Sequence, residues 1–432
     1  MNPDAVLKKL YNVFSPDPLP AGDPKYVNFQ EVRGRSDVLH LKRRIELSDK
    51  TLCQLYSGHM GGGKTTELNC LVAKLREAGY RVVYFSADSE DIETEDARYT
   101  DVLLACVRYL LQELKNDSAT PLYDWLKDRW SSLQDLLGSK LEVTTELQAK
   151  LPLVFAELSS TLRVNPTARS KIRELLDAHT VTLVDALNEF ICAAHPETQQ
   201  LVLVVDGLDK IVRVVMDETT KRTNLQEIFV DRSEQLKRLA CHVIYTVPIS
   251  LAHSVNSLEL ENRYGRVEIL PMVTIRRRGS TDLCEKGLKT LRELIAKRLQ
   301  VANISVEELV QPNELKRLCL MSGGHVRNLV QVVHTALVHT AVEYSENLPL
   351  SARVVERSIA QMRETMRRAI EWHEWDQLAE THRDQHEKAY HDLLFRRLIL
   401  EYRDDDETVW HDIHPLIEEM AEFQAAFQRL QS

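Results

Sequence analysis

The stretch Gly58-His59-Met60-Gly61-Gly62-Gly63-Lys64-Thr65 matches the pattern G-x-x-x-x-G-K-[ST]. Its glycines let the backbone turn sharply, so that successive amide groups can surround an anion at the start of a helix. Lys64 supplies a positive charge for the outer phosphates of a nucleoside triphosphate, and the Thr65 hydroxyl can ligate Mg²⁺. The sequence therefore predicts a phosphate-binding loop (P-loop) made by Gly58, Met60, Gly61, Gly62, Gly63, Lys64, Thr65 and Thr66.

The residues on both sides of this loop have the pattern that it requires. Residues 51–57 form a short run typical of a buried strand, and four apolar residues recur with helical spacing over 68–75. Gly79 is suited to end that helix, and residues 81–85 have the composition of a second strand. Strand, loop, helix and strand in this order predict an α/β fold of the P-loop NTPase type, with a parallel sheet flanked by helices.

A second motif ends a strongly apolar run. Leu201-Val202-Leu203-Val204-Val205-Asp206 predicts a central parallel strand that is buried on both faces. Asp206 would then emerge at the carboxyl edge of the sheet, where ligands bind in open α/β folds. This is the Walker B arrangement, in which the aspartate holds Mg²⁺ through water. Asp209 follows closely, either as the carboxylate that activates water or as the N-cap of a helix.

Two further strands supply polar candidates. Thr246 lies in a predicted strand at 242–248, where it could sense the terminal phosphate. Arg263 and Arg266 precede a predicted strand at 267–273. An arginine at this place can project toward the phosphate of a neighbouring subunit and raise the rate of hydrolysis by roughly 10³–10⁵. An ordinary surface arginine is the alternative interpretation of each.

These motifs resemble those of the AAA+ and STAND families of P-loop ATPases. Residues 29–37, which contain Gly34 and Arg35, are similar to the Gly-Arg element near the adenine pocket of those families. Residues 206–209 are similar to the STAND form of Walker B, and residues 322–327 resemble the Gly-x-x-Arg turn called sensor 2. The resemblance implies that Arg327 reaches the γ-phosphate from a helical lid.

The chain departs from these families in two places. Most relatives in the additional-strand class of ATPases carry a glutamate directly after the Walker B aspartate, where this chain has Gly207. Asp209 is the nearest substitute, so the resemblance implies ATP binding with slower hydrolysis. The sequence also lacks an obvious STAND repeat array, which implies that a separate protein supplies the stimulus or the output.

The rest of the chain divides by its patterns into three predicted domains. Residues 1–275 form the NTPase core, with a helical insertion at about 90–195. The apolar stripes of that insertion either face a partner protein or close on the core. Residues 276–345 form a helical lid, and residues 346–432 form a winged-helix-like domain, because predicted helices precede a hairpin with an acidic turn.

Composition limits the class of protein. At 432 residues, with 44% hydrophobic and 28% charged residues, the chain is long enough for two or three soluble domains. It has no apolar run of membrane-spanning length, and its first residues lack the features of a signal peptide. The seven cysteines contain no C-x-x-C pair. These features predict a cytoplasmic protein with reduced thiols.

The sequence leaves several functions open. The first is a molecular switch that binds ATP or ADP with Mg²⁺ and changes conformation or assembly, as a homo-oligomer or with a separate effector protein, in a bacterial signalling or defence system. The second is a DNA-associated AAA+ ATPase such as an initiator, loader or transposition regulator. The net charge of −10 and the acidic turn at 403–407 disfavour a broadly DNA-binding surface, whereas Arg276-Arg277-Arg278 could form a local basic patch. The third is a nucleotide-binding scaffold that does not hydrolyse ATP.

Overall fold

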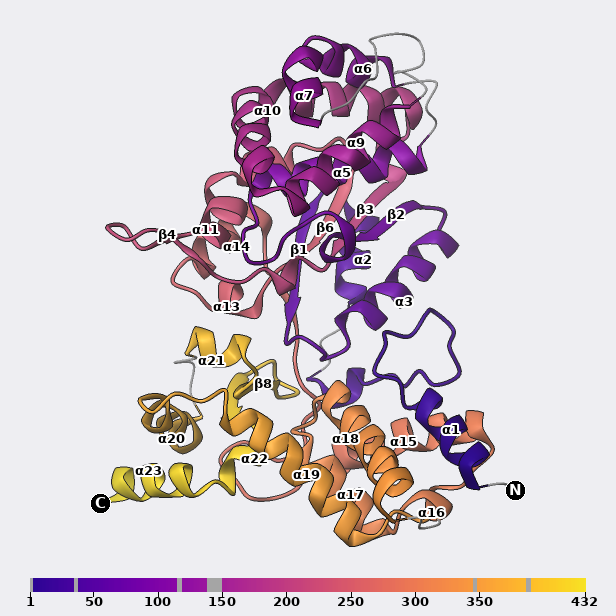
Figure 1. Cartoon of the computed structure of the whole chain (residues 1–432), viewed down its shortest axis with the longest axis vertical. Coiled ribbons are helices and arrows are strands. Elements are labelled where there is room, and N and C mark those ends of the chain that lie inside the picture. The colour runs from indigo at the N-terminus through magenta and orange to yellow at the C-terminus, as the bar shows by residue number, and fades with distance from the viewer. Residues whose placement is uncertain (1–2, 35–37, 115–118, 138–149, 345–347, 386–389) are drawn as a thin grey trace. The chain divides into compact units, whose positions relative to one another are not determined.

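A computed structural model of the chain describes residues 3–34, 38–114, 119–137, 150–344, 348–385 and 390–432 (Figure 1). It contains two compact units. The first consists of residues 1–38, 58–70 and 269–432, and the second consists of residues 39–57 and 71–268. The P-loop therefore belongs to the same unit as the segments predicted to form the lid. The three domains in sequential order stay a prediction.

A five-stranded sheet organises the fold. Its order is β2-β3-β6-β1-β7, and the pairs β1–β6, β3–β6 and β2–β3 are parallel. The strands are β1 Cys53–Gly58, β2 Arg81–Ser86, β3 Leu201–Asp206, β6 His242–Thr246 and β7 Glu268–Leu270. Every residue of β3 is buried, as expected for a central strand. The predicted α/β fold with a parallel sheet is confirmed, and one strand, β6, stands between the P-loop strand and the Walker B strand.

Strand β7 is shorter than the predicted strand at 267–273. The backbone amides that follow it are bonded to other segments of the first unit. Met272 donates to the Glu401 carbonyl at 2.8 Å, Val273 to Gly324 at 3.3 Å and Thr274 to Val32 at 3.0 Å. Because these donors are already engaged, the apolar run continues past Leu270 without pairing to a neighbouring strand.

The helix after the P-loop forms where the spacing predicts it. This helix, α3, spans Lys64–Glu77. Leu68, Leu71, Val72 and Leu75 are all buried. Gly79 follows the helix with a φ of 91° and donates to the Arg76 carbonyl at 3.0 Å. A left-handed glycine just beyond the last turn is a common helix stop.

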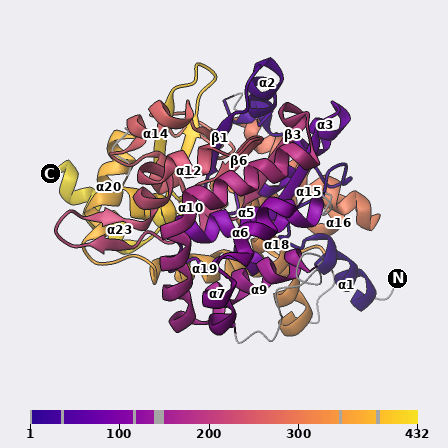
Figure 2. The ribbon, with the colours of Figure 1, turned by 90° about the horizontal axis from the view of Figure 1, so that it is seen from above.

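The second unit is rich in helices, and helices α5, α6 and α10 gather together in Figure 2. The apolar stripes of the predicted insertion are buried: Val102, Leu110, Trp125, Leu183 and Phe190 are at most 4% exposed. These stripes therefore form core. The helices of this unit are α2 Leu39–Leu47, α4 Ala87–Glu90, α5 Tyr99–Glu113, α6 Thr120–Lys127, α7 Trp130–Leu137, α9 Leu151–Val164, α10 Pro166–Ala194, α11 Asn224–Gln226, α12 Ser233–Lys237, α13 Ile249–Ala252 and α14 Ser257–Tyr264, with a small hairpin of β4 Val215–Asp217 and β5 Arg222–Thr223.

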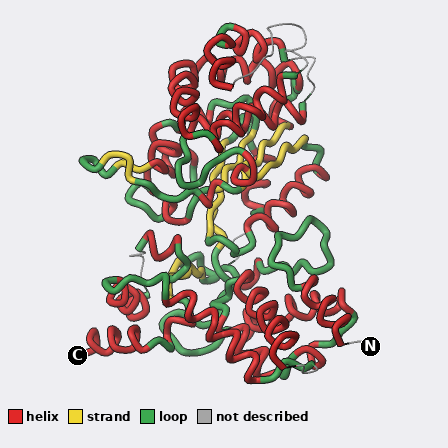
Figure 3. The backbone as a smooth tube through the Cα atoms, viewed as in Figure 1, coloured by secondary structure: helices red, strands yellow, loops and turns green. Residues whose placement is uncertain are grey.

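The first unit contains a helical bundle and a C-terminal module (Figure 3). The bundle packs leucines, valines and isoleucines of its helices into one core, which also takes in Phe14, Phe29 and Val273. Its helices are α1 Pro3–Val13, α15 Glu285–Ala302, α16 Val306–Leu309, α17 Pro312–Met321, α18 Val326–His339 and α19 Ala352–Arg367. The C-terminal module consists of α20 Glu374–Asp384, α21 His391–Phe395, the antiparallel strands β8 Ile399–Arg403 and β9 Val409–Ile413, α22 Pro415–Glu418 and α23 Ala421–Gln431. Among the helices described, none has both the length and the apolar character needed to span a membrane.

Candidate functional site

The P-loop backbone adopts conformations that only glycine tolerates well. Gly58, Gly61 and Gly63 have φ angles of 142°, 82° and 110°. A Cβ at Gly58 would lie 2.7 Å from the Leu270 carbonyl oxygen, and one at Gly61 would lie 2.8 Å from the His325 ring. Side chains at either position would collide with the first unit. The glycines of the motif are therefore required by the geometry as well as by the chemistry of phosphate binding.

The Lys64 side chain is hydrogen-bonded to the backbone of the P-loop. Its side chain is 4% exposed, and its Nζ donates to the carbonyls of Gly58 at 2.7 Å and His59 at 2.9 Å. This places the ammonium group inside the curve of the loop. Thr65 follows in the first turn of α3, and the Thr66 hydroxyl accepts a hydrogen bond from the Leu19 amide at 3.1 Å.

Arg33, which is not among the predicted site residues, also contacts the loop. Arg33 is 2% exposed, donates from Nη2 to the Gly62 carbonyl at 2.6 Å and lies over the Phe29 ring at 5.0 Å. Its neighbour Gly34 has a φ of 57°, and a Cβ there would lie 2.6 Å from the Asp404 carbonyl. Arg35, which the resemblance places near the adenine, lies outside the described residues.

The turn that resembles sensor 2 is bonded directly to the P-loop. The backbone amide of Arg327 donates to the Gly61 carbonyl at 3.2 Å. The Arg327 side chain also lies against the loop, because a Cβ at Gly61 would lie 3.0 Å from its Cβ and Cδ. Arg327 therefore lies beside the loop at the start of α18, and its contact with a γ-phosphate stays a prediction.

His325 makes a second connection between this turn and the loop. Its Nε2 lies 2.8 Å from the Met60 carbonyl, and its Nδ1 accepts from the Asn328 amide at 3.1 Å as the N-cap of α18. The first contact needs a proton on Nε2 and the second a lone pair on Nδ1, so the imidazole is neutral. Burial, and then the charge of Arg397, hold the pKa of His325 well below its usual range.

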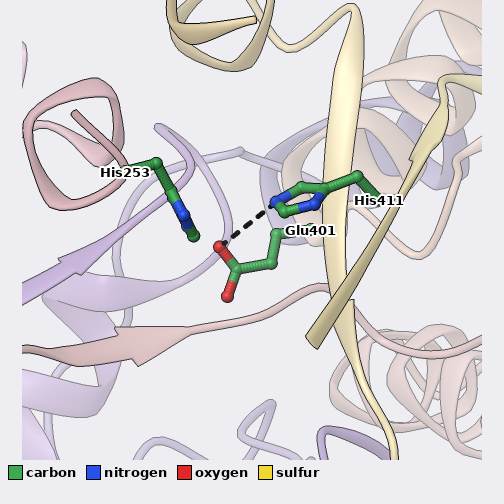
Figure 4. A group of neighbouring side chains, drawn as sticks. All are labelled: His253, Glu401 and His411. Carbon is green, nitrogen blue, oxygen red and sulfur yellow. Dashed lines mark ion pairs between the residues drawn. The ribbon is translucent and has the colours of Figure 1, made fainter. Parts of the chain in front are cut away.

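His59 ties the loop to the C-terminal module. Its Nδ1 lies 3.2 Å from the Leu394 carbonyl, and its Nε2 accepts from the Glu401 amide at 2.9 Å. Glu401 on β8 and His411 on β9 are both buried, with 3.9 Å between Oε2 and Nε2 (Figure 4). His59 occupies a position that the motif leaves unspecified. It therefore connects the loop to the C-terminal module, a role that the motif pattern does not reveal.

The Walker B half of the candidate site lies in the second unit. Asp206 is 2% exposed, accepts from the Tyr84 hydroxyl at 3.0 Å and accepts from the Gly207 amide at 2.7 Å. Burial and the Asp206 carboxylate raise the pKa of Tyr84, so its phenol stays protonated and donates. A carboxylate at the carboxyl end of a central strand is the kind of group that can hold a hydrated Mg²⁺, and this role of Asp206 stays a prediction.

The geometry explains why glycine stands after the Walker B aspartate. Gly207 has a φ of 83°, and a Cβ there would overlap Oδ1 of Asp88. Asp88 accepts from the Ser86 hydroxyl at 2.7 Å and pairs with Lys210 at 2.5 Å. A carboxylate from α4, the short helix that follows β2, thus fills the space in which a side chain at position 207 would begin. Asp88 is a site candidate that sequence spacing could not find, because it lies 118 positions before Asp206 in the chain.

Asp209 follows the Walker B strand β3, and Thr246 ends the neighbouring strand β6. Asp209 is 5% exposed and is the second residue of a short turn of 3-10 helix, Leu208–Lys210. The N-cap of that turn is Gly207, so Asp209 is not the cap. The Thr246 hydroxyl accepts from the Leu208 amide at 3.1 Å, which fixes the same turn.

The two candidate finger arginines differ in their surroundings. Arg263 on α14 donates to the Ser233 hydroxyl at 2.8 Å and pairs with Glu259 at 2.6 Å. Arg266 has an exposed side chain, and its carbonyl accepts from Arg44 at 3.0 Å. The role of either arginine as a finger toward a neighbouring subunit stays a prediction.

Comparison with known proteins gave structural likenesses alone. No family model and no curated protein matches the chain. It is similar to the Aeropyrum pernix ORC2 protein solved with ADPNP and ADP, at 12% identity and a TM-score of 0.40 over 98% of both chains. It is similar to the Aeropyrum pernix ORC1 protein solved with DNA, at 12% identity and a TM-score of 0.42 over 97% of this chain and 96% of that one. It is also similar to a Walker-type ATPase of Pyrococcus abyssi, at 12% identity and a TM-score of 0.43 over 96% of this chain and 99% of that one.

Proposed function

We propose that this protein is an ATP-binding switch of the AAA+ and STAND type that hydrolyses ATP slowly. One observation carries the proposal. The sensor-2-like turn is hydrogen-bonded to the P-loop itself, through His325 to Met60 and through the Arg327 amide to Gly61. A nucleotide that orders this loop therefore acts directly on the position of α18 and the helices packed against it.

Different residues of the site are proposed to bind different parts of the nucleotide and its Mg²⁺ ion. Lys64 supplies its charge to the β- and γ-phosphates, and the glycine-rich turn presents backbone amides to them. His325 and Arg327 bond to carbonyls of the loop rather than to its amides. Thr65 and Asp206 have the oxygen ligands that Mg²⁺ prefers, and the ion would offset the charge that builds on the phosphates.

The switch depends on whether the lid can distinguish ATP from ADP. Arg327 lies beside Gly61, and a guanidinium can bind a phosphate through two parallel hydrogen bonds. We expect Arg327→Ala to bind ADP as the wild type does and to lose any compaction or assembly specific to ATP. Small-angle scattering with ADP and with a slowly hydrolysed ATP analogue measures this. Arg327→Lys is the matched control, because it keeps the charge and loses the planar fork. An ATP-specific change that persists in Arg327→Ala would place the switch elsewhere.

Hydrolysis needs a carboxylate that activates water, and two candidates stand near the end of the Walker B strand: the buried Asp209 and the half-buried Asp88. We expect Asp209→Asn to keep ATP binding and to lower turnover by roughly 10²–10⁴, the usual contribution of a general base. Phosphate release measures turnover, and the ATP-induced melting shift measures binding. Asp217→Asn, on the exposed β4 hairpin, is the control. Full turnover in Asp209→Asn together with a loss in Asp88→Asn would assign the base to Asp88 instead.

A DNA-associated ATPase is the second candidate function. Helix α19 and the next residue, Arg368, carry five arginines against two glutamates in a chain of net charge −10. Four of these arginines are exposed: Arg353, Arg357, Arg367 and Arg368. Such a helix can contact a phosphate backbone. Binding to a DNA duplex that weakens steeply with salt, and weakens again when Arg353 and Arg357 become alanine, would favour this function over the first.

A further inference from the structure

A pocket of about 540 Å³ lies in the first unit, apart from the P-loop. Helices α18 and α19 line it, together with the turn that joins α21 to β8. Its volume falls within the range of small-molecule sites. The described residues that line it include two arginines and several amides and hydroxyls, and no aspartate or glutamate. In a chain with a net charge of −10, this pocket is unusual in having no acidic lining.

The pocket is built around Arg397. This residue has a φ of 64° and directly follows Arg396, the C-cap residue of α21. Its amide donates to the Leu394 carbonyl at 3.1 Å and that of Leu398 donates to Leu393 at 2.9 Å, the two bonds of a Schellman cap. Glycine is the usual residue at this position, and another residue costs about 1–2 kcal/mol there. A strained residue of this kind points to a role outside the cap.

The two arginines of the pocket differ in how their charge is balanced. Arg396 pairs with Glu374 and also donates to the Ala369 carbonyl at 2.5 Å. The Arg397 guanidinium has no ion pair or hydrogen bond with the described residues, although its side chain is half-buried. Burial, and then the charge of Arg327, lower the pKa of Arg397. A half-buried cation without a counter-charge is unfavourable unless an anion accompanies it.

The other side chains of the pocket suit an organic molecule. Met362, Met366 and Leu398 give it an apolar wall, and methionine adapts well to ligands of irregular shape. Thr335 and Gln331 supply hydroxyl and amide groups beside that wall. The combination of one uncompensated guanidinium with an apolar wall favours a ligand with a single anionic group on a small apolar body.

We propose that this pocket binds a small organic anion, whose phosphate or carboxylate group pairs with Arg397 and whose apolar part packs on Met362, Met366 and Leu398. The ligand would link α18, α19 and the start of β8, and so would stiffen the bundle against the C-terminal module. The proposal does not rest on the proposed function, because no residue of the P-loop lines this pocket.

Thermal melting of the full chain with two aromatic anions tests the site. The probes are phenyl phosphate and benzoate, which distinguish a phosphate from a carboxylate ligand, and benzamide is the neutral control of similar shape. We expect at least one anion to raise the melting temperature at saturation and benzamide to leave it unchanged. The effect should persist in Lys64→Ala, because the P-loop is not the binding site.

Arg397→Gly is the decisive variant, since glycine removes the guanidinium and suits the left-handed backbone. It should melt without ligand at or above the wild-type temperature and should lose the response to the anions. Arg368→Ala, which removes an exposed arginine of the same unit, should keep that response. The proposal is overturned if neither anion shifts the melting of the wild type, or if Arg397→Gly responds as the wild type does.

Discussion

Lys64→Ala is expected to abolish the stabilisation of the fold by ATP and Mg²⁺. The ammonium group lies within hydrogen-bond distance of the carbonyls of Gly58 and His59, inside the curve of the P-loop. Alanine would leave the phosphates without the strongest mobile cation of the loop. A ligand at 1,000 times its dissociation constant stabilises a protein by roughly 4 kcal/mol, so the wild type should show a large shift and the variant almost none.

Thermal melting with and without the nucleotide measures this effect. Lys74→Ala is the matched control, because Lys74 is an exposed lysine on the same helix, α3. It should keep the full ATP-induced shift. If Lys64→Ala also kept it, phosphate binding at this loop would be excluded.

The second large effect is a loss of stability in mild acid. His325 and His414 are both buried helix N-caps in the first unit, and each accepts a hydrogen bond from a backbone amide. Burial, and then the charge of Arg397, lower the pKa of His414 to about 3 and hold that of His325 well below its usual range. In the unfolded chain each histidine has a pKa of about 6.5.

The direction of the effect follows from the proton count. Below about pH 6.5 the unfolded chain binds protons at these histidines and the folded chain does not, so stability falls as the pH falls. The stability that the two neutral histidines contribute is fully present above that pH. Below about pH 6.5, each of these histidines lowers the free energy of unfolding by about 1.4 kcal/mol for every unit by which the pH falls. His382 acts in the opposite direction, because Asp412 raises its pKa in spite of burial.

Urea denaturation between about pH 7 and about pH 5 measures this slope. His325→Asn and His414→Asn are suitable variants, since asparagine is a good N-cap and does not titrate. Both variants should flatten the dependence on pH. A wild-type stability that is constant over this range, or a slope that the two substitutions leave unchanged, would contradict the assignment of neutral caps.

The local part of the candidate site could be read from the sequence, because it depends on short-range rules. The P-loop, its helix and the strand that ends at Asp206 follow from glycine conformations and apolar periodicity over a few residues. The length of β7 could not be predicted in the same way. Its apolar run looks like a long strand, and only the fold shows that the amides of residues 272–274 bond to other segments.

The missed residues come from elements that the fold brings to the motifs. Tyr84 and Asp88 reach the Walker B strand because β2 pairs with β3 in parallel, with Ser86 opposite Asp206. His325 lies inside the quoted sensor-like turn, yet its importance comes from two hydrogen bonds that its sequence position does not specify. Arg33 stands two residues before Arg35, which the resemblance favoured. In each case the residue type is ordinary, and the spatial neighbours make it significant.

The hydrogen bonds from His325 and Arg327 to the loop carbonyls have a thermodynamic consequence. If nucleotide strengthens these two bonds by ordering the loop, then the bonds must strengthen nucleotide binding by the same factor, because coupling between two binding events is reciprocal. A substitution far from the phosphates that loosens α18 would then weaken the binding of ATP. A partner that braces α18 would strengthen the binding of ATP. The affinity for ATP thereby becomes a property that other molecules can set from outside the site.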